Sequence, residues 1–127
     1  MMQAGEYYVG DLCYVLHERW DEVCNLIIKD NKCLDGEFEL ADGTKFAIYG
    51  TKYGDGTYFD LAENEYWVDA GSIGCVLLEN IDLSVEGNQI MGGQVIDFSS
   101  DFTTSSDNGV IKIGSVHIDT DPEDDYA

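Results

Sequence analysis

The alternation of apolar and polar residues predicts a chain that is mainly β-sheet. Residues 37–40 and 45–49 alternate on either side of Asp42 and Gly43, and an Asp-Gly pair between alternating runs is a strong signal for a β-hairpin. Further short strands are predicted at 8–9, 12–16, 57–59, 66–68, 75–78, 81–85, 89–91, 94–98, 110–113 and 116–118. The polar stretch 99–108 is predicted to be a loop. The connections are too short for parallel crossovers, so the sheet should be antiparallel.

One amphipathic helix is predicted over residues 17–28. Its apolar positions recur at helical spacing and are Trp20, Val23, Cys24, Ile27 and Ile28. Acidic residues in its first turns suit the positive end of the helix dipole. Trp20 is expected to anchor the helix against the sheet, and Asp30 and Asn31 are expected to end it.

These elements together predict an α+β fold that is mainly β. A bent antiparallel sheet or open barrel of about seven to nine strands would carry the single amphipathic helix near the N-terminus. Residues 1–118 are expected to form one domain, since 127 residues suffice for one domain and are few for two. The acidic end of the chain, residues 119–127, is expected to be a disordered tail.

The charge is the strongest functional signal in this sequence. The formal net charge is −20, and Lys112 is the only cation after Lys52. A soluble domain of this size needs a net charge of only about 2–8 in magnitude, and a larger excess costs stability through self-repulsion. Bare nucleic acid and anionic membranes carry the same sign of charge, so neither is expected to be a direct partner.

Export and membrane insertion are not indicated. Residues 1–10 lack Lys, Arg and an apolar run, and no apolar stretch approaches the roughly 18 residues that span a bilayer. Without an export signal, the four cysteines at 13, 24, 33 and 75 are interpreted mainly as free buried thiols, with a disulfide as the alternative. The protein is therefore expected to be intracellular, in the cytoplasm of a host cell.

Several stretches resemble a set of small acidic proteins encoded in phage, other viral and bacterial genomes. The shared segments are 7–14 (YYVGDLCY), Trp20, 35–43 (DGEFELADG), 53–58 (YGDGTY) and 68–75 (VDAGSIGC). The resemblance covers about residues 5–82, and no activity is attached to these proteins. It implies a phage or mobile-element origin, and small acidic phage proteins are often inhibitors of host proteins.

Candidate chemistry in the sequence is sparse. Cys13, His17, Cys24 and Cys33 do not have the paired spacing of a zinc site, so neither a metal nor a cofactor is predicted. A cysteine nucleophile beside His17 or His117 is not indicated by any motif, and no catalytic residues are predicted.

The carboxylates Glu63, Glu65 and Asp69 flank Tyr66 and Trp67, a pattern seen in carbohydrate sites. The alternative interpretation is that Tyr66 and Trp67 lie on opposite faces of a strand, with at least one of them in the core.

The favoured function is inhibition by nucleic-acid mimicry. Carboxylates on one face would imitate phosphates and occupy the groove of a basic nucleic-acid-binding protein, such as a host nuclease, a restriction or CRISPR effector, or a transcription regulator. The residues expected to form this anti-defence face are Glu79, Asp82, Glu86, Asp97, Asp101 and Asp107. The alternatives are a structural or accessory acidic domain and a small-molecule-binding module; a homodimer stays open.

Overall fold

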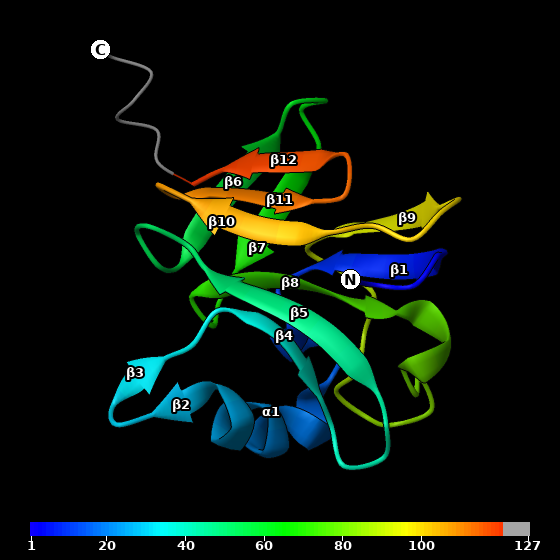
Figure 1. The fold of residues 1–127 in the computed structure, drawn as a ribbon. Coiled ribbons are helices and arrows are strands. Elements are labelled where there is room, and N and C mark those ends of the chain that lie inside the picture. Colours follow the sequence, from blue (N-terminus) through cyan, green and yellow to red (C-terminus); the bar gives the residue numbers. More distant parts are fainter. Residues whose placement is uncertain (121–127) are drawn as a thin grey trace.

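A computed structural model describes residues 1–120 and shows two five-stranded antiparallel sheets with one short α-helix (Figure 1). The first sheet has the order β4 (Gly36–Glu39), β5 (Lys45–Gly50), β8 (Ser72–Leu77), β1 (Gly5–Gly10) and β9 (Gln94–Phe98). The second has the order β10 (Thr104–Asp107), β11 (Val110–Ile113), β12 (Val116–Asp119), β6 (Gly56–Asp60) and β7 (Glu65–Val68). The predicted fold class is confirmed, and neither sheet closes into a barrel.

The first sheet is buried on both faces, which makes the fold three layers deep. Tyr7 and Val9 of β1 face a core shared with the second sheet. Tyr8 faces a second core, which lies between the first sheet and the helix. Neighbouring strands alternate in the same way, as Ala47 and Phe46 of β5 do. Strands buried on both faces are continuously apolar rather than alternating. This explains why the most apolar strand, β8, lies at the centre of its sheet.

The helical layer is shorter than predicted. A 3₁₀ turn, η2 (His17–Arg19), leads into α1 (Trp20–Ile27), which lies beneath the first sheet (Figure 1). Val23 and Ile27 are buried, but Trp20 is only half-buried. The prediction that Trp20 is the main anchor is therefore corrected: the smaller side chains carry the contact. Ile28 has already left the helix and begins a two-residue ribbon of β2 (Ile28–Lys29) and β3 (Lys32–Cys33).

Ile27 and Ile28 offer a matched test of this packing. Ile27 is 6% exposed and Ile28 is 45% exposed, although they are neighbours with the same side chain. Ile27→Ala is expected to lower the free energy of unfolding by about 2–5 kcal/mol, because it leaves a cavity in the core beneath the first sheet. Ile28→Ala should cost less than about 1 kcal/mol. Urea unfolding of both variants checks this, and equal losses would contradict the observed end of the helix.

Four predicted elements are wrong, and local polar groups explain three of them. The expected strand at 12–16 is instead a 3₁₀ turn, η1 (Leu12–Tyr14), which begins where the Asp11 side chain accepts from the Cys13 amide. The expected strands at 81–85 and 89–91 are loop, preceded by the 3₁₀ turn η3 (Leu78–Asn80). There Asp82 and Asn88 bond nearby backbone groups, which competes with a sheet ladder.

The fourth wrong element is the loop expected over 99–108. Residues 104–107 form β10, which pairs with β11 along its whole length. The Ser and Thr residues of β10 lack an apolar signal, and pairing with the apolar β11 places them in the sheet. In the middle of the same sheet, β12 continues to Asp119 and Thr120 is buried, so ordered structure extends two residues beyond the expected domain boundary. The remainder of the predicted tail, 121–127, lies outside the described residues.

Candidate functional site

An acidic edge forms where β1, β9 and η3 come together. Glu6 of β1 is paired directly with Asp97 of β9 in the antiparallel ladder. Like charges in directly opposed positions destabilise a sheet. The chain therefore keeps two carboxylates side by side at a cost in stability, one on β1 and the other on the edge strand β9.

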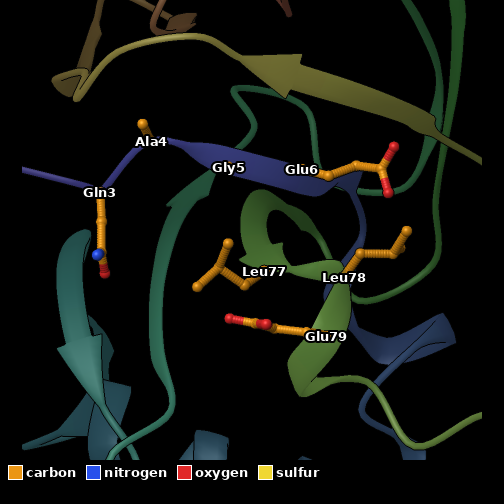
Figure 2. A pocket seen from close by; sticks show the side chains of 7 residues that line it. All are labelled: Gln3, Ala4, Gly5, Glu6, Leu77, Leu78 and Glu79. Carbon is orange, nitrogen blue, oxygen red and sulfur yellow. The ribbon is translucent and has the colours of Figure 1, made fainter.

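Two hollows extend this acidic edge to either side. One, of about 460 Å³, lies between β1 and η3 and includes Glu6 and Glu79 among its lining residues (Figure 2). The other, of about 500 Å³, includes Asp97 and Asp101. Because Glu6 is paired with Asp97, the four carboxylates follow one another around this edge. Figure 2 shows Glu79 extending beneath Leu77 while Glu6 points the opposite way, so these two carboxylates diverge instead of converging on one ion.

Two carboxylates of this edge, Asp101 and Glu79, influence the pKa of the Tyr7 hydroxyl. Burial first, and then the nearby groups Cys75, Asp101, Glu37 and Glu79, together raise the pKa of Tyr7 to about 12. Its hydroxyl donates to the Gln3 carbonyl at 2.6 Å. Asp101 is itself held in place, since its Oδ1 accepts from the Ala4 amide at 2.8 Å. Within the acidic edge, Glu6 and Asp97 thus stand on paired strands, Glu79 stands on η3, and Asp101 is held by its bond to Ala4.

All six predicted site residues are exposed, but the structure does not place them on one face. Glu79, Asp97 and Asp101 belong to the acidic edge. Asp82 and Glu86 continue from η3 along the 81–91 loop, which packs against the helical layer: the Asn88 Oδ1 accepts from the His17 amide at 2.7 Å.

Asp107 lies elsewhere, at the end of β10. That strand runs opposite to β9, and its end lies on the other side of the molecule (Figure 1). Sequence reasoning also missed Glu6, and only its pairing with Asp97 could have revealed it.

Few cations compensate these charges within residues 1–120. Arg19 pairs with Asp42 at 2.8 Å and with Glu22 at 3.7 Å, beside the helix. Lys45 and the N-terminal amine both pair with Glu37. None of the six predicted site residues, nor Glu6, forms an ion pair within the described part of the chain. The acidic edge is therefore left available to an external cationic surface.

The thiols of Cys13 and Cys75 are poorly suited to nucleophilic chemistry. Burial raises the pKa of the Cys75 thiol to about 12. Burial, together with the neighbouring Asp11 carboxylate, raises the pKa of the Cys13 thiol well above its usual range. A reactive cysteine needs the opposite shift, because the thiolate is the nucleophile. All four cysteines are free, and Cys33 is exposed, contrary to the expectation that the thiols are buried.

The shifted carboxyl groups are likewise not those of a general acid, which needs a raised pKa. A hydrogen bond from Arg19 lowers the pKa of Asp42, and hydrogen bonds from Ser84 lower the pKa of Asp82. Burial opposes ionisation at Asp60, yet the Tyr66 hydroxyl and nearby amides lower its pKa overall. Within residues 1–120, no group of three or more His, Cys, Asp or Glu side chains is arranged to hold a metal ion.

The aromatic pair flanked by carboxylates is divided between the core and the surface. Tyr66 is fully buried and donates to Asp60 at 2.7 Å, whereas Trp67 is 43% exposed. The interpretation that at least one of the two belongs to the core is confirmed. Trp67 and the carboxylate of Asp69 line a third hollow, on the side of the second sheet.

Comparison with known proteins adds no assignment: no family model, no curated protein and no solved structure matches this chain. Within residues 1–120, none of the helices is both long enough and apolar enough to traverse a bilayer.

Proposed function

We propose that this chain is an acidic interaction protein that binds and inhibits a basic nucleic-acid-binding protein by imitating nucleic acid. The observation that carries the proposal is the acidic edge, in which Glu6 and Asp97 are directly paired and continue to Glu79 and Asp101 without an ion-pair partner among the described residues. B-DNA presents about one charge per 1.7 Å of its axis, counting both strands. A groove that binds such an array is also attracted to closely spaced carboxylates.

Three features support mimicry over an acidity that serves solubility alone. The charge exceeds what solubility needs, since it totals −20. Two carboxylates are kept in an unfavourable cross-strand pair. Glu6, Asp97 and Glu79 stand on paired strands and a 3₁₀ turn, and Asp101 is held by the Ala4 amide, so little conformational entropy is lost when they bind. The class of partner this favours is a host nuclease, a restriction or CRISPR effector, or a regulator with a basic groove.

Competition with nucleic acid tests the proposal. The protein, immobilised, is used to capture binders from host lysate at low salt, and each captured protein is purified and loaded with fluorescent duplex DNA or RNA. We expect the acidic protein to displace the labelled nucleic acid, and its association to slow steeply as salt rises from about 0.05 to 0.5 M because long-range attraction is screened. Simultaneous binding of both to every captured protein would overturn mimicry and favour an accessory acidic domain.

A further inference from the structure

An aromatic hollow lies on the side of the second sheet, apart from the acidic edge. It has a volume of about 540 Å³ and is bounded by β6, β7, η1 and the segment before β9. Its lining residues are Tyr14, Asp55, Gly56, Thr57, Trp67, Val68, Asp69 and Met91. The combination of an exposed Trp, a Tyr, a Met and two carboxylates is absent from the two hollows of the acidic edge.

Trp67 is held in a defined position. Its indole N–H donates to Glu65 Oε2 at 2.9 Å, and its backbone N–H donates to the Gly92 carbonyl at 2.8 Å. Because the polar edge of the ring is already bonded, the exposed 43% of the residue presents mainly the apolar π surface. A fixed aromatic surface of this kind can receive a planar or cationic group without first being ordered.

Tyr14, from η1, lines the same hollow as Trp67. Its hydroxyl donates to Asp69 Oδ2, and its carbonyl accepts from the Gln89 amide at 2.8 Å. Gly92 sits between the two aromatic residues with a φ of +66°. A Cβ at this position would lie 2.7 Å from the Tyr14 ring and 3.2 Å from the Trp67 Cβ. The positions of both aromatic side chains against this segment therefore depend on glycine at 92.

The charges around the hollow select a cation. Asp55 and Asp69 line it, and Glu65 lies at the indole edge; none of the three forms an ion pair within residues 1–120. Trp is the best aromatic partner for a cation held over its face. A planar guanidinium can stack on the ring and donate two parallel hydrogen bonds to a carboxylate, which an ammonium cannot do.

We propose that this aromatic hollow binds the guanidinium group of an arginine from the basic partner protein. The inference rests on the proposed function only in naming the source of the arginine. Strand β9 connects the two sites, since the side chain of its first residue, Gln94, donates to the Glu65 carbonyl at 3.3 Å while Asp97 lies further along the strand at the acidic edge. The acidic edge would attract the basic groove over a distance, and the hollow would fix one of its side chains.

The direct test uses N-acetyl-arginine amide as the probe in an NMR titration of the full chain. The reporters are the Trp67 indole N–H and the Gly92 amide. We expect both signals to shift and saturate, and we expect the neutral isostere N-acetyl-citrulline amide to bind at least about tenfold more weakly. Equal binding of the citrulline analogue would overturn the proposal, as would a larger response to the neutral sugar maltotriose.

Matched variants separate this hollow from general attraction to an acidic protein. Trp67→Ala and the double variant Asp55→Asn with Asp69→Asn should each weaken binding of the probe by at least about fivefold, read at Gly92. The controls are Leu61→Ala, which removes another exposed apolar side chain, and Asp97→Asn with Asp101→Asn, which removes the same charge from the acidic edge. Both should stay within about twofold of the wild-type chain. Equal weakening by the Asp97 and Asp101 double variant would mean that the probe senses net charge only, which overturns the proposal.

The two proposals fail in distinguishable ways. If the probe does not bind but the protein still displaces nucleic acid from a captured partner, the hollow is not a guanidinium site and mimicry stands. If the probe binds with the expected dependence on Trp67 and displacement never occurs, the hollow stands and mimicry is wrong.

Discussion

Asp11→Ala is expected to lower the free energy of unfolding by about 3–5 kcal/mol, since it would leave several backbone donors without partners. Asp11 is fully buried at the end of β1. Its Oδ1 accepts from the Cys13 amide at 3.0 Å, and its Oδ2 accepts from the amides of Asp69 and Ala70, both at 2.7 Å. One carboxylate thus begins η1 and also ties β1 to the turn between β7 and β8. Among residues 1–120, these three amides have no other acceptor outside the regular elements.

Asp82→Ala is the matched control for this prediction. Asp82 also accepts from the amide two residues further on, that of Ser84, at 3.0 Å, but its side chain is exposed. Water can replace the lost acceptor there, so the unfolding midpoint should hardly change. Urea unfolding followed by circular dichroism measures both variants. Equal, small effects would show that the Asp11 carboxylate is not needed to hold the two segments together.

Charge reversal at the acidic edge is expected to have the largest effect on function. The double variant Glu79→Lys with Asp97→Lys should raise the concentration needed to displace labelled nucleic acid from a captured partner by at least about tenfold, because it places like charges against the basic groove. Folding should survive the change. Both side chains are exposed, and a lysine at 97 would face Glu6 across the ladder in place of a second carboxylate.

The control for this variant carries the same change of net charge in other places. Asp107→Lys with Asp21→Lys alters the end of β10 and the first turn of α1, and both elements are placed away from β9 in Figure 1. It should weaken displacement by less than about threefold, through the reduced long-range field alone. If the two double variants weaken displacement equally, the partner senses total charge and the acidic edge is not a defined binding surface.

The pattern of carboxylates around Tyr66 and Trp67 is visible in the sequence, but the hollow beside Trp67 is not. The sequence places three carboxylates near two aromatic residues, and strand alternation alone predicts that one aromatic residue faces inward. It does not reveal that Tyr14, more than fifty residues earlier, lies against the same hollow as Trp67, or that Gly92 makes room for both. Those contacts join segments that share no local signal, so only the folded chain shows them.

Local physics in the sequence was enough to determine most of the elements. Apolar alternation and an Asp-Gly turn determine the hairpin of β4 and β5, and helical spacing determines α1. Composition determines the excess of negative charge. The hairpin and the helix depend on residues that are close together in the chain, and the net charge depends on composition alone. None of the three requires a contact between distant segments.

Tertiary structure alone decided which surfaces those elements present. The ladder between β1 and β9 joins residues about ninety positions apart and sets Glu6 against Asp97. The opposite directions of β9 and β10 separate Asp107 from the other predicted site residues. Strand pairing also converts the polar stretch 104–107 into β10, because the backbone hydrogen bonds to β11 outweigh a weak local preference. The physical reason is that a sheet is held together by non-local backbone pairing, and its register is set by the burial of one face, which no short window of sequence contains.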